Sequence, residues 1–110
     1  MRLPKAENAR VHHEKLTRYL LSETHPVGRS KAKFFRGVGY DESSVTVLEQ
    51  GLIEIARTEA IVETAASRHG MKYIVDGLIT TPSGGRVRVR TVWIVDAGED
   101  HPRFVTAYPL

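Results

Sequence analysis

The spacing of hydrophobic residues changes once along the chain, near residue 60, and this change predicts where helices give way to strands. Before that point, apolar residues recur every three or four positions, as in helices with one buried face. The segment "HHEKLTRYLL" predicts a first helix over about residues 12–22, and "RSKAKFFRGV" predicts a second that Gly37 and Gly39 end. Asp41 is typical of an N-cap before a longer third helix, whose apolar stripe is Val45, Leu48, Leu52, Ile55 and Ala56.

After residue 60, hydrophobic and polar residues alternate, which is the period of a strand with one buried face. Four segments follow this pattern: "AIVETAA", "MKYIVDGLITTP", "RVRVRTVWIVDAG" and "RFVTAYPL". The "SGG" between the second and third segments predicts a glycine hairpin. We therefore expect an α+β fold, in which two to three N-terminal helices precede a four-stranded antiparallel β-meander. The length of 110 residues suits a single domain over residues 1–110.

The composition excludes several classes of protein. The chain has no cysteine, so it holds no disulfide, thiolate metal site or cysteine nucleophile. No apolar run is long enough to cross a bilayer, and the start "MRLPKAENAR" lacks the apolar core of a signal peptide. With its Met1 start, the sequence therefore predicts a stand-alone, soluble, cytoplasmic protein without membrane contact. The 16 Lys and Arg residues against 13 Asp and Glu give a net charge of +3, which permits nucleic-acid binding without requiring it.

Positive charge concentrates in the segment "THPVGRSKAKFF", at the start of the predicted second helix. The first turn of a helix offers backbone N–H groups and a positive dipole end to an anion. His25 stands just before this turn and could act as a general acid or base, and Lys31 could stabilise negative charge on phosphorus. The other basic residues here are candidates for RNA contact: Arg29, Lys33 and Arg36. Alternatively, His25 only caps or packs at the turn, and the lysines extend over the core from a solvated face.

A second basic row lies on the third predicted strand, where alternation puts Arg86, Arg88 and Arg90 on one face. Arginine donates two parallel N–H bonds to phosphate, so this row could track a nucleic-acid backbone. It could equally pair with acidic residues of neighbouring strands, for which Glu63 and Asp76 are the candidates. Trp93 falls on the opposite face, which we expect to be core.

The sequence offers no metal site and no cofactor motif. His12 and His13 are adjacent, so on a helix they point about 100° apart and do not form the i, i+4 pair of a helical zinc site. His69 and His101 fall in predicted turns. We therefore expect neither a metal nor a cofactor.

Several segments carry a resemblance over nearly the whole chain: "MRLPKAENA", "HPVGRSKAKFF", "YIVDG", "TVWIV" and "GEDHPRFVTAYPL". Together they resemble a family of small bacterial proteins to which no activity is assigned. This resemblance implies family membership and says little about chemistry.

A more distant resemblance rests on helices followed by a four-stranded sheet, a His and a Lys near a helix start, and a final Thr-Ala-Tyr-Pro. These features resemble the barnase, EndoU, colicin E5 and RelE-like group of metal-independent ribonucleases and toxins. The resemblance implies RNA cleavage by attack of the ribose 2′-OH on the adjacent phosphate. The matching residues are His25, Lys31, Thr106 and Tyr108, and Arg90 is our choice to hold phosphate oxygens because it lies near the strand centre.

Two hypotheses follow. In the first, the chain is a toxin-like endoribonuclease that acts on RNA and is held in check by a small acidic antitoxin or immunity protein. In the second, it is a non-catalytic module of the same fold that binds nucleic acid or protein. The sequence predicts neither the RNA target nor the oligomeric state.

Overall fold

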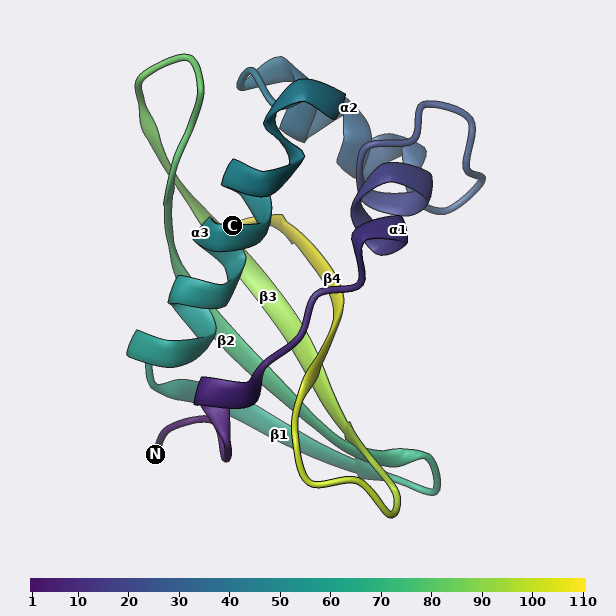
Figure 1. The fold of residues 1–110 in the computed structure, drawn as a ribbon, viewed down its shortest axis with the longest axis vertical. Helices are drawn as coiled ribbons and strands as arrows, with labels where there is room; N and C mark the ends of the chain where they lie inside the picture. The colour runs from purple at the N-terminus through teal and green to yellow at the C-terminus, as the bar shows by residue number, and fades with distance from the viewer.

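A four-stranded antiparallel sheet follows three helical segments in the computed structural model, which describes all of residues 1–110 (Figure 1). The strands lie side by side in chain order, so the sheet is a meander. They are β1 (Ile61–Ser67), β2 (Gly70–Thr80), β3 (Arg86–Asp96) and β4 (Arg103–Pro109). The predicted α+β class and the predicted order of elements are confirmed.

The first predicted helix is divided and ends earlier than expected. A single α-helical turn, α1 (His13–Lys15), continues directly into a π-helical segment, η2 (Leu16–Leu20). The wider coil arises because the N–H of Leu21 donates to the carbonyl of Leu16, five residues back, at 2.8 Å. The prediction that this helix extends to Ser22 is therefore wrong.

The second and third helices match the sequence pattern more closely. They are α2 (Arg29–Gly37) and α3 (Val45–Thr58), with short 3₁₀ turns at Ala6–Asn8 and Glu42–Ser44. Asp41 forms a capping box, in which its side chain accepts from the N–H of Ser43 at 2.8 Å and its own N–H donates to Ser44 Oγ at 2.9 Å. The cap belongs to the 3₁₀ turn that leads into α3, and the predicted stripe of α3 is buried throughout.

The core lies between α3 and one face of the sheet. Two glycines allow this close packing: a Cβ on Gly77 of β2 would lie 2.7 Å from Ile55, and one on Gly51 of α3 would lie 3.2 Å from Ile79. Trp93 is fully buried in this core, as predicted, and its ring packs edge-on against Phe104.

One buried polar group is fully satisfied inside the core. Thr91 Oγ1 donates to the carbonyl of Val75 at 2.6 Å and accepts from Trp93 Nε1 at 2.8 Å. The arginine row of β3 alternates with these buried residues and so occupies the opposite face of the sheet. No helix in the structure is both long and apolar enough to span a membrane.

Candidate functional site

The ring of Tyr19 on η2 gathers side chains from three separate parts of the chain. Its hydroxyl lies 2.9 Å from Thr106 Oγ1 on β4. The His25 ring meets it edge-on, with centroids 5.1 Å apart. Two ammonium groups lie over its face, with Lys15 Nζ 4.9 Å and Lys31 Nζ 5.8 Å from the ring centre. We call these five half-buried residues the Tyr19 cluster.

A glycine at the contact between α2 and η2 allows the two segments to lie close together. A Cβ on Gly28 would lie 2.1 Å from the carbonyl oxygen of Tyr19 and 3.1 Å from its ring, so no larger residue fits there without movement. Leu20 and Leu21 beside it are fully buried and anchor η2 in the core. The loop between η2 and α2 therefore has to fold back over Tyr19, which brings His25 and Lys31 to the same ring.

His25 caps the turn that leads into α2 with its side chain. Its Nδ1 accepts hydrogen bonds from the N–H groups of Val27 and Gly28, each at 3.0 Å. An accepting Nδ1 carries no proton, so the neutral ring in this arrangement holds its proton on Nε2. His25 therefore caps this turn, and its ring presents Nε2–H as a hydrogen-bond donor rather than as a base.

The Tyr19 cluster is positively charged and has no acidic member. Neither Lys15 nor Lys31 forms an ion pair, and each ammonium is held over the face of the tyrosine ring instead. The polar groups beside them are the hydroxyls of Tyr19 and Thr106 and the imidazole of His25. This combination of cations and donors suits an anion with several oxygens.

The remaining basic residues of α2 lie away from this cluster. Arg36 donates to the carbonyl of Leu21 at 2.9 Å and pairs with Glu42 and Glu23, and its bond lowers the pKa of the Glu42 carboxyl. Its charge is therefore already compensated. Arg29 and Lys33 are exposed and line a separate hollow of about 450 Å³ on the outer side of α2.

Arg90 forms an ion pair with an acidic residue of a neighbouring strand, which is one of the two roles predicted for the arginine row. Its Nε and Nη2 donate to the two carboxylate oxygens of Asp76 at 2.9 and 3.0 Å. This bidentate pair raises the pKa of Arg90, and the hydroxyl of Tyr108 adds to the effect. Tyr108 lies directly opposite Arg90 in the β3–β4 ladder. Two of the five guanidinium N–H groups are used on Asp76.

Thr106 and Tyr108 share the sheet face of the arginine row, although β4 is irregular just before them. Thr106 pairs with Val92, but the next pair is Phe104 with Trp93, so Val105 is an extra, bulged residue. The bulge lets Phe104 point into the core while Thr106, two residues on, points to the other face. Thr106 thereby reaches Tyr19, and Tyr108 reaches Arg90.

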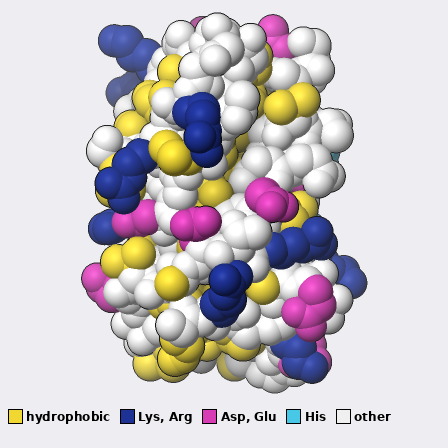
Figure 2. Space-filling view, turned by 90° about the vertical axis from the view of Figure 1, so that its left-hand side faces the viewer, with side chains coloured by type: hydrophobic (Ala, Val, Ile, Leu, Met, Phe, Trp, Pro, Cys, Tyr) yellow, Lys and Arg dark blue, Asp and Glu magenta, His cyan; other side chains and the backbone are white.

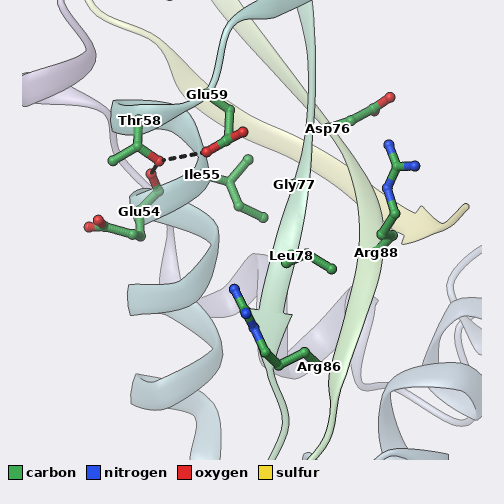
Figure 3. Close-up of a pocket in the computed structure, with 9 residues that line it drawn as sticks. All are labelled: Glu54, Ile55, Thr58, Glu59, Asp76, Gly77, Leu78, Arg86 and Arg88. Carbon is green, nitrogen blue, oxygen red and sulfur yellow. Dashed lines mark hydrogen bonds between the residues drawn. The ribbon is translucent and has the colours of Figure 1, made fainter.

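The side chains of Arg86 and Arg88, both on β3, lie away from the Tyr19 cluster, beside the edge of β2. They line a hollow of about 370 Å³ together with Glu54, Ile55, Thr58, Glu59, Asp76, Gly77 and Leu78 (Figure 3). Glu63 on β1 is exposed and forms no ion pair. No three His, Cys, Asp or Glu side chains gather closely enough to hold a metal ion.

Comparison with known sequences identifies the family. Residues 2–110 match DUF6883, a domain of unknown function. The chain belongs to this family. No curated protein sequence matches this DUF6883 domain.

The fold of this DUF6883 domain also occurs in a solved complex. The match is to a chain of a contact-dependent growth inhibition toxin–immunity protein complex from Klebsiella pneumoniae 342, with a TM-score of 0.70 and 20% sequence identity. It covers 94% of this chain and 95% of the other. At that identity, the likeness shows a shared fold.

Two members of the Tyr19 cluster were not predicted from the DUF6883 sequence. Both lie within the segment predicted as the first helix, and neither Tyr19 nor Lys15 was given a role there. The available signal was their spacing, because residues four apart on a helix lie on one face and a lysine can then cover a tyrosine ring. The contact of Tyr19 with Thr106 had no such local signal.

Proposed function

We propose that this protein is a toxin-like, metal-independent endoribonuclease that cleaves RNA in the cytoplasm and uses the Tyr19 cluster to bind the reacting phosphate. The observation that carries the proposal is the Tyr19 ring, which has Thr106 at 2.9 Å and two unpaired lysines over its face. The shared fold supports a role in a toxin–immunity pair, because the solved chain belongs to a complex of a contact-dependent growth inhibition toxin with its immunity protein, and this support applies equally to a toxin and to an immunity protein.

The reaction would form one bond and break another at the same phosphorus. The 2′-oxygen attacks, the bond to the 5′-oxygen breaks, and the products are a 2′,3′-cyclic phosphate and a 5′-hydroxyl. Negative charge builds on the non-bridging oxygens during this step. Lys15 and Lys31 would stabilise that charge, as positioned cations do for phosphoryl groups.

His25 would hold the phosphate through Nε2–H. An acid or base role requires a proton to move on or off the ring, and Nδ1 is occupied by two backbone N–H groups. Taking the 2′-OH proton at Nε2 would place the ring proton on Nδ1 and break the capping bonds of the turn before α2. In the arrangement present, His25 is therefore a donor, the 2′-OH proton leaves to water, and the 5′-oxygen takes a proton from water.

The other predicted residues would extend the phosphate site along the sheet. Arg90 is fixed by Asp76 and lies opposite Tyr108, one pair along from the Thr91–Ala107 pair. Its remaining N–H groups could hold a neighbouring phosphate, and Tyr108 could contact the adjoining base. Arg29 and Lys33, exposed on α2, could contact the RNA backbone beyond the cluster.

A second candidate is a non-catalytic module that binds protein or nucleic acid, as an immunity protein or antitoxin does. One observation favours it: none of the four surface hollows is lined by a member of the Tyr19 cluster. Active sites usually lie in concave pockets, so a cluster on an unhollowed surface also suits binding alone.

Induced expression in a bacterial host separates the two candidates. The nuclease proposal predicts that the wild-type chain arrests growth and fragments RNA, and that His25→Ala and Lys31→Ala each lose both effects. Lys72→Ala is the matched control, because Lys72 is exposed and lies outside the cluster. Harmless expression of folded wild-type protein, with intact RNA, would overturn the nuclease proposal in favour of the binding module.

A further inference from the structure

Half of strand β2 has no neighbour on its outer side. β1 pairs with β2 only as far as Val75, which faces Ile61, so Asp76–Thr80 forms an open edge. At the hairpin, the N–H of Thr81 donates to the carbonyl of Gly85 at 2.8 Å, so the backbone groups of Thr81 point toward β3. Because β2 and β3 pair residue for residue, the backbone groups of every second residue before Thr81 also point toward β3. Those of the residues between them, which include Leu78 and Thr80, point outward, away from β3.

One of these outward groups is already used within the domain. The hydroxyl of Tyr40 donates to the carbonyl of Thr80 at 2.8 Å. The N–H and C=O of Leu78 and the N–H of Thr80 are left without a strand to bind. Unpaired edge groups of this kind are a template for another strand.

Two adjoining hollows follow this edge between β2 and α3. Their volumes are about 370 and 460 Å³, and both are lined by Glu54, Leu78 and Arg86. Apolar side chains border them, since Leu78 is 46% and Val47 is 55% exposed. The edge therefore has open space beside its backbone groups, which an extended chain needs.

Unpaired charges of opposite sign border this space. Glu54 projects from α3, Glu59 directly follows that helix, and Arg86 reaches past Leu78 toward it (Figure 3). None of them, nor Arg88, takes part in an ion pair. Figure 2, which views the molecule from the side on which α3 and the β2–β3 hairpin lie in Figure 1, shows acidic, basic and hydrophobic side chains intermixed.

We propose that Asp76–Thr80 is a docking edge for an extended segment of a partner protein, which joins the sheet beside β2 as a fifth strand. The segment that fits has alternating side chains. Acidic residues on one side meet Arg86 and Arg88, and basic or hydroxyl residues on the other side meet Glu54 and Glu59. A second copy of this chain fits less well, because two-fold pairing of the edge would bring both copies' Glu54 and Glu59 together.

A capped heptapeptide tests this proposal without a known partner and without any RNA assay. The probe has Glu at alternate positions and Lys or Thr between them, and its control contains the same residues in shuffled order. We expect the alternating peptide to bind and to slow hydrogen exchange at the amides of Leu78 and Thr80. Binding of the shuffled peptide should be weaker.

Two variants at one position show whether the backbone of β2 makes the contact. Leu78→Pro removes the outward N–H and no bond to β3, whereas Leu78→Thr keeps that N–H. We expect Leu78→Pro to weaken peptide binding at least about tenfold, because one hydrogen bond is lost and a carbonyl of the bound peptide is left without a donor. Leu78→Thr should change the affinity little. Circular dichroism confirms that each variant is folded.

Three results would overturn the proposal. The first is no binding of the alternating peptide at about 1 mM, the weak end of the affinity scale. The second is equal binding by wild type and folded Leu78→Pro. The third is concentration-dependent dimerisation of wild type that Leu78→Pro abolishes, because the occupant of the edge would then be a second copy.

Discussion

Tyr19, near the N-terminus, and Thr106, on the last strand, share a hydrogen bond of 2.9 Å across 87 positions of the chain. This contact joins the first helical segment to the edge strand β4. It also determines which side chains can meet, because Lys15, His25 and Lys31 are all arranged around the Tyr19 ring. A single tyrosine thus connects the basic helix start with the end of the sheet.

Removing the tyrosine hydroxyl should loosen this connection without removing the ring. We expect Tyr19→Phe to lower the free energy of unfolding by about 1 kcal/mol, the usual contribution of a part-buried hydrogen bond. Thr106→Val should cost a similar amount, and the double variant should cost less than the sum of the two. Urea denaturation of the four proteins measures this coupling, and strictly additive effects would show that the bond contributes nothing to stability.

Gly28 should tolerate no side chain. In Gly28→Ala, the new Cβ would lie 2.1 Å from the carbonyl oxygen of Tyr19, so η2 and α2 must separate. We expect a loss of about 1–3 kcal/mol of stability, as for other overpacked sites. Gly37→Ala is the matched control at the other end of α2, where a Cβ meets nothing within 4 Å and helix propensity favours alanine. Equal thermal stability of the two variants would contradict the account of this contact.

His25 should have separable capping and phosphate-binding roles. Asparagine can accept the same two backbone N–H bonds through Oδ1, so His25→Asn should retain the stability of the turn that leads into α2, whereas His25→Ala should lose about 1 kcal/mol. Nitrogen-15 chemical shifts of the wild-type ring should show a protonated Nε2 and an unprotonated Nδ1. The opposite tautomer would be incompatible with the cap.

Asp96 should make stability fall in acid. Its bonds to Arg103, at 2.6 and 3.0 Å, hold the pKa of its carboxyl below the usual 3.8. A carboxyl whose pKa is lowered by folding stabilises the protein at any pH above its pKa in the unfolded state. This contribution is lost as the pH falls through its pKa in the folded state. Asp96→Asn should therefore reduce the dependence of the melting temperature on pH below about 4, by a small amount because the pair is partly exposed. An unchanged dependence would show that the pair is not maintained in solution.

The sequence predicted the elements well because their signals are local. The third helix shows its apolar stripe and its cap within the segment itself, and the strands alternate over long runs. The π-helical turn at Leu16–Leu20 was not predicted. The hydrogen bond that defines it, from the N–H of Leu21 to the carbonyl five residues back, leaves no distinct pattern of residue types. The bulge at Val105 was missed for a similar reason, since it depends on the register with β3.

The candidate site could be predicted only in part. His25 and Lys31 were chosen by their chemistry and Thr106 by the resemblance to the ribonuclease group, and the structure places all three at one ring. The tyrosine that gathers them was not found, because its contact with β4 joins distant parts of the chain. The use of Arg36 was also missed, since its bond to the carbonyl of Leu21 depends on how α2 packs against the preceding segment.

The most direct test of the central claim is incubation of the purified protein with mixed RNAs in the presence of a metal chelator, followed by analysis of the RNA ends. We predict that the wild-type chain yields fragments with 2′,3′-cyclic phosphate and 5′-hydroxyl ends. His25→Asn and Lys31→Gln, both folded, should yield far fewer. Intact RNA with folded wild-type protein, or undiminished cleavage by both variants, would contradict the assignment of RNA cleavage to the Tyr19 cluster.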